Sequence, residues 1–360
     1  MAYMSRRAFI GLSSTLAAGT VFGLGACSAP SANSANSQQQ TSATEASQAE
    51  ASGSASSSVA SLTAPSQALS FDVEAGKVTL SNGVEMPTYG IGTYILTPEQ
   101  AAESVFWAIE AGARLIDTAA AYNNEEGVGQ GIARAIDAGL VQREELFVTT
   151  KLWNNGYSED GVNGALERLG LDYVDLLFVH QAMGDYLHGY EIVLQAMEEE
   201  KTRSVGLSNH TNAQFVEVIS ALGVAPQVAQ YECHPHLQRH AAQGFLAQYE
   251  TQLESWFPLG GKGNTQVFLE DETILGIAQA HNKSAAQIIE RWHLQEGRVI
   301  MPGSHNQDHI RENTALFDFS LSDDEMASIR SLDQNSAYYG MVGSMSQDVL
   351  ESFGDYTFEA

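Results

Sequence analysis

The chain has 360 residues, and its 44 Asp and Glu outnumber its 17 Lys and Arg, giving a formal net charge of -27 at pH 7. Such an acidic surface repels nucleic acid and anionic lipid head groups, so we expect neither to bind it directly. The length exceeds what one small hydrophobic core requires, and the N-terminal part differs in composition from the rest.

Residues 1–26 have the features of an export signal. Ser5-Arg-Arg-Ala-Phe-Ile10 precedes a mildly apolar run rich in Gly, Ser, Thr and Ala, which resembles a twin-arginine signal. The run ends in Leu24-Gly-Ala-Cys27, which resembles the lipobox of bacterial lipoproteins and makes Cys27 the expected site of lipid attachment. An uncleaved transmembrane anchor is the alternative, but the run is short and interrupted by glycine.

Residues 27–70 consist largely of Ser, Ala, Gln and Thr. Such a segment cannot bury enough apolar surface to offset the entropy of ordering, so we expect a flexible tether. The only cysteines are Cys27 and Cys233, and a lipidated Cys27 leaves Cys233 without a disulfide partner. This pattern fits folding in the reducing cytoplasm before twin-arginine export. We expect a protein anchored by lipid at the outer side of the bacterial cytoplasmic membrane or in the cell envelope.

The elements predicted after the tether begin with a hairpin and continue as strands that alternate with helices. Two short apolar runs around Asn82-Gly83 predict the hairpin over 77–87, which could plug one end of a barrel. The predicted pairs are strand 89–92 with a helix from 98, 114–117 with a helix from 124, 146–151 with 159–169, 174–180 with a helix from 190, 203–208 with 212–222, 227–230 with 238–248, 252–256 with helices over 272–295, and 299–303 with a short helix from 308. Eight pairs favour an α/β fold of the (β/α)8 TIM-barrel type over 71–345, with a C-terminal tail at 346–360.

Four polar side chains follow the ends of the predicted strands. One short buried strand ends at Asp117, with Tyr122 just beyond it; the next ends at Lys151, and another at His180. In α/β barrels these ends share the rim that carries the chemistry. Each residue alone could be structural, as a helix cap, a rim aromatic, a surface charge or a satisfied histidine. Together they predict that a paired ammonium lowers the pKa of Tyr122, which protonates a carbonyl oxygen while hydride reaches the carbon.

Several ordered motifs resemble those of the aldo-keto reductase superfamily, from residue 77 to about 333. The motifs are Gly90-Ile-Gly-Thr-Tyr94, Arg114-Leu-Ile-Asp-Thr-Ala119 with Tyr122, Thr150-Lys-Leu-Trp153, Asp172-Tyr-Val-Asp-Leu-Leu-Phe-Val-His180, Gly206-Leu-Ser-Asn209, Gln230-Tyr-Glu-Cys-His-Pro235, Trp256-Phe-Pro-Leu-Gly260 and Met301-Pro-Gly-Ser304 through Arg311-Glu-Asn313. The resemblance implies a monomeric NAD(P)H-dependent enzyme that reduces an aldehyde or ketone, a small-molecule carbonyl substrate, to an alcohol. The alternative is a nicotinamide-binding sensor or regulatory subunit with little turnover.

The resemblance also assigns roles to individual residues. Tyr122 would be the proton donor, Lys151 and Asp117 would lower its pKa, and His180 would orient the substrate, with Tyr94 as a further wall of the pocket. The implied coenzyme-binding residues are Gly92, Thr93, Asp117, Ser208, Asn209, Gln230, Trp256, Pro258, Leu259, Gly303, Ser304, His309, Glu312 and Asn313. Among these, the polar side chains at 208, 209 and 230 would bind the nicotinamide carboxamide, and the indole at 256 would stack on the ring.

The sequence departs from the family pattern at the coenzyme phosphate. Members that prefer NADPH usually hold its 2′-phosphate with a Lys and an Arg, where this chain has Gly303 and His309. The turn still offers backbone N–H groups at a helix start, and His305 and His309 could supply positive charge when protonated. NADP(H) is therefore the coenzyme by resemblance, with NAD(H) comparably possible. The family often has Trp-Pro after the His180 position, whereas Gln181 follows here, so substrate specificity stays open.

Two other patterns resemble binding motifs but have simpler interpretations. Gly127-Val-Gly-Gln-Gly131 lacks the last glycine spacing of a dinucleotide fingerprint and follows acidic residues, so it predicts an ordinary helix start. His234, His236 and His240 suggest metal ligands, but Pro235 separates the first two and belongs to the family pattern. We therefore expect no metal.

Overall fold

The structure, a computed structural model, describes residues 68–339. Within them, eight parallel strands form one sheet in which each strand pairs with the next along the chain. A parallel bridge between Tyr89 and Ile300 joins the two ends of the sheet and closes the barrel. The barrel strands are β4 (Gly90–Gly92), β5 (Leu115–Asp117), β6 (Phe147–Leu152), β7 (Val174–Val179), β8 (Thr202–Ser208), β9 (Val228–Glu232), β10 (Gln252–Trp256) and β11 (Val299–Ile300). The predicted (β/α)8 barrel is confirmed.

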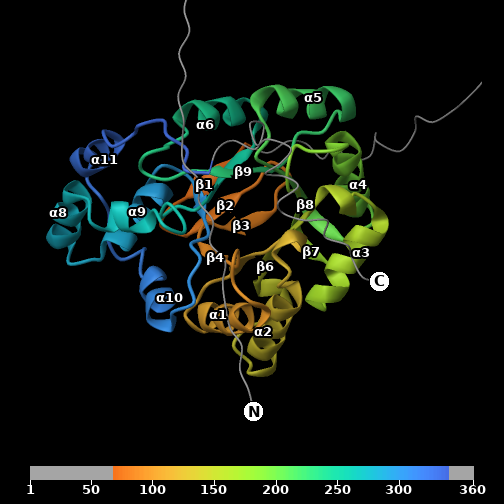
Figure 1. The fold of residues 1–360 in the computed structure, drawn as a ribbon, viewed down its shortest axis with the longest axis horizontal. Helices are drawn as coiled ribbons and strands as arrows, with labels where there is room; N and C mark the ends of the chain where they lie inside the picture. The colour runs from red at the N-terminus through yellow and green to blue at the C-terminus, as the bar shows by residue number, and fades with distance from the viewer. Residues whose placement is uncertain (1–67, 340–360) are drawn as a thin grey trace, which may run out of the picture. The chain divides into compact units, whose positions relative to one another are not determined.

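Helices surround this barrel, as Figure 1 shows. They are α1 (Pro98–Glu110), α2 (Glu125–Asp137), α3 (Glu159–Leu169), α4 (Tyr186–Glu198), α5 (Asn212–Leu222), α6 (His240–Leu246), α7 (Thr265–Leu269), α8 (Glu272–His281), α9 (Ala285–Gln295), α10 (Gln307–Asn313) and α11 (Asp323–Arg330). Short 3-10 helices lie at η2 (Ala120–Tyr122), η3 (Arg143–Glu145), η4 (Asn154–Gly156) and η5 (Ala247–Tyr249). Two short helices of the second half, α7 with 5 residues and α11 with 8, were not predicted.

The predicted hairpin plugs one end of the barrel. β2 (Lys77–Thr79) and β3 (Glu85–Pro87) pair in antiparallel fashion, and the side chains of Val78 and Met86 are fully buried. They share a hydrophobic cluster with inward residues of the barrel strands. Those residues are Leu115, Phe147, Leu176, Phe178, Val228 and Val299. A further strand, β1 (Ser70–Asp72), pairs with β2; it begins at the last residue assigned to the tether and was not predicted, because three residues carry too little alternation.

Capping residues move several helix boundaries from their predicted positions. α4 begins at Tyr186 rather than at residue 190, because the side chain of Asp185 accepts a hydrogen bond from the backbone N–H of His188 at 3.1 Å. The helices predicted over 272–295 are α8 and α9, and they separate because Asn282 takes a left-handed conformation with φ 53° and Ser284 then caps α9. Hydrophobic periodicity located these helices, and side-chain caps set their ends.

The glycine repeat at 127–131 lies in the first turns of α2, as predicted. A Cβ on Gly127 would lie 2.0 Å from the backbone oxygen of Pro98 in α1, and one on Gly129 would lie 2.2 Å from that of Leu169 in α3. The glycines therefore allow three helices to pack at close range. This packing, rather than coenzyme binding, explains the repeat.

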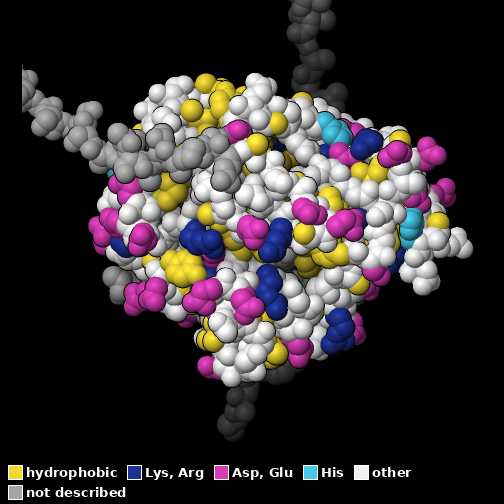
Figure 2. Space-filling model, turned by 180° about the vertical axis from the view of Figure 1, so that it is seen from behind, with side chains coloured by type: hydrophobic (Ala, Val, Ile, Leu, Met, Phe, Trp, Pro, Cys, Tyr) yellow, Lys and Arg dark blue, Asp and Glu magenta, His cyan; other side chains and the backbone are white. Residues whose placement is uncertain are grey.

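The expected signal peptide, Cys27, most of the tether and the tail at 346–360 lie outside the described residues. Between residues 68 and 339, no helix combines the length and hydropathy needed to cross a membrane. Figure 2 shows one face of the molecule, over which Asp and Glu side chains are spread, with Lys and Arg between them. The acidic composition is thus visible at the surface.

Candidate active site

The four polar residues predicted at the strand ends come together at one site. The Lys151 ammonium, at the end of β6, lies 2.7 Å from both carboxylate oxygens of Asp117 and 3.3 Å from the Tyr122 hydroxyl. It also donates to the backbone oxygen of Thr118 at 2.9 Å. The lysine side chain is fully buried, so its charge is balanced by the carboxylate and not by solvent.

Side chains from two other strands, β6 and β9, hold the Asp117 carboxylate in place. The Thr149 hydroxyl donates to its Oδ1 at 2.8 Å, and the Gln230 amide donates to the same atom at 3.2 Å. The backbone oxygen of Asp117 accepts hydrogen bonds from the backbone and the hydroxyl of Thr93, both at 3.0 Å. Burial lowers the pKa of Lys151, but the charge and hydrogen bond of Asp117, together with Tyr122 and Glu254, outweigh it and leave that pKa raised. Lys151 therefore carries its charge at neutral pH.

Tyr122 retains its proton more strongly than the sequence suggested. Burial raises the pKa of Tyr122 to about 12, because the positive charge of Lys151 offsets only part of the desolvation and Asp117 opposes it. Lys151 lowers this pKa as predicted, but the net lowering is wrong, since the burial of the ring, which could not be read from the motif, raises it by more. A phenol that keeps its proton at neutral pH is nevertheless the form that a proton donor needs.

His180 lies beside Tyr122 as an uncharged ring. Burial, reinforced by the charge of Lys151, holds the pKa of His180 well below its usual value. Its ring makes edge contacts with those of Tyr122 and Trp153, with centroids 5.6 and 5.0 Å apart. His180 Nδ1 is buried without a described hydrogen-bond partner. A neutral imidazole at this place can hydrogen-bond a carbonyl oxygen without adding charge.

Aromatic rings surround the tyrosine hydroxyl on the outer side. Tyr94 is 41% exposed, and its ring centroid lies 5.0 Å from that of Tyr122 and 5.7 Å from that of Phe257. Tyr94, Tyr122 and His180 thus lie together, as predicted for a substrate pocket. Trp153 and Phe257 were not assigned to it, although Trp153 stands two residues after Lys151 and Phe257 directly follows Trp256, both of which had predicted roles.

The predicted nicotinamide-binding residues lie side by side at the ends of β8, β9 and β10. Ser208 pairs with Gln230 in the sheet register, and the backbone N–H of Asn209 donates to the Gln230 backbone oxygen at 3.0 Å. The Trp256 indole N–H donates to Asn209 Oδ1 at 2.9 Å. Trp256 is only partly buried, so it is not simply a core residue. A flat ring carrying an amide fits this set of polar groups beside an indole.

Pro258 and Leu259 follow Trp256 in a loop whose backbone is unusual. Phe257 has φ 51° and Gly260 has φ 81°. The strand after β10 is β11, which closes the barrel against β4. Gly303 follows β11, and a Cβ on it would lie 3.1 Å from the backbone oxygen of Gly92 at the end of β4. Residues predicted to bind one coenzyme, though far apart in sequence, thus line the same rim.

At the turn expected to bind the 2′-phosphate of the coenzyme, several groups that could contact the phosphate already have partners within the protein. Asn306 caps α10 by accepting hydrogen bonds from the backbone N–H groups of Asp308 and His309 at 2.9 and 3.2 Å, so these donors are already used. His305 faces α1, where its Nδ1 lies 3.3 Å from the Ser104 hydroxyl. Our expectation of free backbone donors is therefore wrong for these two groups.

The other residues predicted to bind the phosphate end of the coenzyme lie in or near the same turn. The Ser304 hydroxyl accepts from the backbone of Asn306 at 3.1 Å. His309 and Glu312 are exposed, and Asn313 is buried at the end of α10. Of the two histidines considered for the phosphate, only His309 remains without a described contact to α1.

Glu254 is a buried carboxyl that the sequence analysis missed. It points into the barrel from β10, and its Oε2 accepts from the Gln230 amide at 3.3 Å. Burial, together with the negative charge of Asp117, raises the pKa of Glu254 well above its usual value. Its position two residues before Trp256, on the same face of the strand, was the available signal.

The histidines considered as metal ligands have separate partners. His234 contacts Glu232 at 3.1 Å, His236 contacts Tyr338 at 2.7 Å, and the third, at position 240, contacts the side chain at 238. In residues 68–339, no group of three or more metal-ligating side chains was found.

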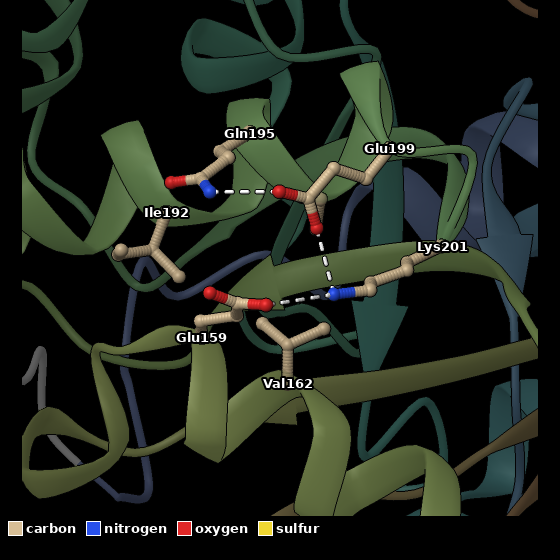
Figure 3. A pocket seen from close by; sticks show the side chains of 7 residues that line it. Glu159, Val162, Ile192, Gln195, Glu199 and Lys201 are labelled. Carbon is tan, nitrogen blue, oxygen red and sulfur yellow. Dashed lines mark hydrogen bonds and ion pairs between the residues drawn. The ribbon is translucent and has the colours of Figure 1, made fainter.

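A hollow between α3 and α4, shown in Figure 3, lies outside the barrel. Lys201 there contacts Glu199 at 2.7 Å and Glu159 at 3.4 Å. Because these carboxylates already pair with its charge, the hollow offers a ligand little to bind.

Comparisons with known proteins agree with this geometry. The pattern of the Aldo/keto reductase family matches residues 88–334. The chain belongs to this family. It is 39% identical to an aldo-keto reductase of Mycobacterium sp. (strain MCS), over 72% of this chain and 92% of the relative. It is 38% identical to a methylglyoxal reductase of Escherichia coli (strain K12), over 71% and 93%.

A solved structure supports the same conclusion. The Bombyx mori aldo-keto reductase, solved in complex with NADP, is 32% identical, with a TM-score of 0.69 over 78% of this chain and 98% of that one. The chain is therefore an NAD(P)H-dependent oxidoreductase of the aldo-keto reductase type, as its sequence suggested.

Proposed function

We propose that this protein reduces an aldehyde or ketone to an alcohol with Tyr122 as the proton donor. One observation carries the assignment: the Tyr122 hydroxyl lies 3.3 Å from a Lys151 ammonium that is itself paired with Asp117. Because the ammonium can only donate, the phenol oxygen accepts from it and keeps its own hydrogen for the substrate. The complete tetrad favours an enzyme over a sensor.

The residues divide the chemistry among them. The bound coenzyme supplies hydride to the carbonyl carbon. Tyr122 gives its proton to the carbonyl oxygen, and Lys151 stabilises the phenolate that remains. The neutral ring of His180 holds the carbonyl oxygen near the phenol. Asp117 keeps the lysine charged and in place throughout.

The pocket walls indicate the kind of substrate. Tyr94, Trp153 and Phe257 place aromatic rings around Tyr122 and His180. We infer an uncharged carbonyl compound with a small apolar or aromatic group, since such surfaces stabilise apolar contacts. The E. coli relative is named a methylglyoxal reductase, which makes small aldehydes a natural starting set.

The coenzyme is NADP(H) by family, and we propose that NAD(H) serves comparably. Support comes from Gly303, which has no side chain to reach a 2′-phosphate, and from His309 in place of a permanent cation. Measuring turnover of a panel of aldehydes with NADPH and with NADH tests the function. Tight coenzyme binding without reduction of any carbonyl would favour the sensor instead.

We further propose that the protein works as a monomer outside the cytoplasm. The monomer follows the family resemblance, and support for the location lies in the N-terminal sequence alone: Arg6 and Arg7 of the twin-arginine pattern, and Cys27 at the end of the lipobox-like run. The lipid on Cys27 would hold the barrel at the outer side of the cytoplasmic membrane or in the envelope through the tether.

A further inference from the structure

Two side-chain amides, those of Asn209 and Gln230, stand next to each other where the coenzyme ring is expected. Their strands are neighbours, and a backbone hydrogen bond of 3.0 Å joins the two residues. An amide presents a donor at one end and an acceptor at the other, and a half turn exchanges them. The neighbours of each amide therefore decide what it offers to a ligand.

Trp256 decides the orientation of Asn209. Its indole N–H lies 2.9 Å from Asn209 Oδ1, and because an indole nitrogen can only donate, the amide oxygen must face it. The Asn209 NH₂ group then points the other way, with contacts of 3.2 Å to the Ser208 hydroxyl and 3.3 Å to Gln181 Oε1. Asn209 is thus held as a donor.

Gln230 is held in the opposite sense. Its NH₂ group donates to Asp117 Oδ1 at 3.2 Å and to Glu254 Oε2 at 3.3 Å. Asp117 faces the Lys151 ammonium at 2.7 Å as a carboxylate, which can only accept. No described residue donates to Gln230 Oε1, so this oxygen remains as an acceptor.

We propose that the Trp256 indole N–H is a positioning group for the coenzyme: by fixing Asn209 as a donor beside Gln230 as an acceptor, it sets how strongly the site distinguishes a carboxamide from related groups. A carboxamide has one carbonyl oxygen for the donor and one NH₂ group for the acceptor. A group lacking either leaves one buried amide unpaired, which weakens binding. This inference rests on the proposed coenzyme site.

The experiment compares the affinities of three oxidised coenzymes: the natural carboxamide, its thioamide analogue and its acetylpyridine analogue. The thioamide keeps the NH₂ group but offers sulfur, a weaker acceptor, to Asn209; the acetyl group keeps the oxygen but has no donor for Gln230. We expect the parent to bind each analogue about threefold to tenfold more weakly, the value of one neutral hydrogen bond.

The decisive variant is Trp256→Phe, which keeps an aromatic ring and removes the N–H. Because the indole surface is lost, the affinity for all three coenzymes should fall by the same factor. The preference for the amide over the thioamide, however, should shrink to about twofold, while the preference over the acetyl analogue persists. Trp292→Phe is the matched control, since Trp292 is buried in α9 and its Nε1 has no described hydrogen-bond partner; it should keep the parent pattern.

The possible results separate clearly. An equal loss for all three coenzymes in Trp256→Phe would reduce Trp256 to a stacking surface and overturn the proposal. A parent that binds all three equally would overturn it too, even if the variant does not fold. A parent that binds no nicotinamide coenzyme would refute the proposed function itself, and this inference with it.

Discussion

Burial and charge act in opposite directions on Tyr122. Desolvation raises the pKa of Tyr122 to about 12, and the nearby Lys151 ammonium reduces that rise without cancelling it. The free protein therefore stores the proton on the phenol. Lys151 matters most after the proton has left, when its charge stabilises the phenolate, so the dyad favours transfer in the direction of reduction.

Replacing Tyr122 with Phe tests this division of roles. We expect turnover to fall by about 10²–10⁴-fold, the usual loss when a general acid is removed, while coenzyme affinity changes little. Steady-state rates with an aldehyde and binding titrations with NADPH measure the two effects. Tyr94→Phe is the matched control, because it also removes a phenol hydroxyl from the pocket. A variant that reduces aldehydes at the parent rate would show that another group supplies the proton.

The coenzyme preference depends on two positions near α10. A charge-assisted hydrogen bond contributes about 1.5–3 kcal/mol, and Gly303 and His309 lack the permanent cations that usually make two of them. We therefore expect the parent to use NADH and NADPH comparably. Gly303→Lys combined with His309→Arg should shift the ratio of dissociation constants towards NADPH by about two orders of magnitude or more.

The control for this pair adds the same charges elsewhere. Leu140→Lys with Val216→Arg places them at exposed positions on the outside of the barrel, where the ratio of dissociation constants should not change. A hundredfold preference for NADPH in the parent would contradict the prediction and show that other groups hold the phosphate.

Glu290 in α9 is a fully buried carboxyl whose two oxygens have no described hydrogen-bond partner. Burial, and the negative charge of Glu312, raise the pKa of Glu290 well above its usual value. The folded protein thus keeps a proton that the unfolded chain loses as the pH rises through the usual range. Stability linked to this group is present at low pH and declines towards neutral and alkaline pH.

Replacing Glu290 with Leu should therefore raise the free energy of unfolding at neutral pH, by about 1–4 kcal/mol. The gain should grow as the pH rises above the ordinary range of a glutamate, about 4.3, as denaturant titrations at several pH values can measure. Glu290→Gln should remove the pH dependence with a smaller gain, because a buried polar group stays unpaired. A gain that is the same at every pH would contradict the account.

At the level of helices and strands, sequence patterns predicted where the elements lie more accurately than which side chains contact one another. Strand ends placed Asp117, Lys151 and His180 on one rim, because parallel strands in a barrel all finish on the same side. The bond from Gln230 to Asp117, which joins residues 113 positions apart, depends on the closed barrel. Glu254 was missed for that reason: its significance lies in side chains brought from other strands.

The close packing of α2 gives a test at the same scale. Gly127→Ala should destabilise the fold by about 1–3 kcal/mol, because the added Cβ would lie 2.0 Å from the Pro98 backbone oxygen. Gly276→Ala in α8 is the matched control, since a Cβ there meets no atom within 4 Å. That variant should gain about 0.5–1 kcal/mol from helix propensity. Thermal unfolding of both variants measures the contrast, and similar effects would mean that α1 and α2 separate easily.

For the whole molecule, the negative net charge limits how the protein can bind to a membrane. The formal net charge is -27, and acidic side chains spread over the face in Figure 2, so anionic head groups repel the barrel. A protein of this composition has no electrostatic attraction to a bilayer. The membrane attachment that we propose must then depend on the lipid at Cys27.

We therefore expect the mature protein to begin at a lipid-modified Cys27 and to partition with membranes, whereas Cys27→Ser should be fully soluble. One acyl chain binds a bilayer only marginally, so stable attachment requires the several chains that a lipobox cysteine receives. Fractionation of cells and intact-mass analysis of the protein from a host with twin-arginine export measure both results. Cys233→Ser is the control, because Cys233 is buried in the barrel and its loss should leave partition unchanged. Replacing Arg6 and Arg7 with Lys should stop export of the folded barrel, and an unmodified Cys27 in exported protein would refute the anchor.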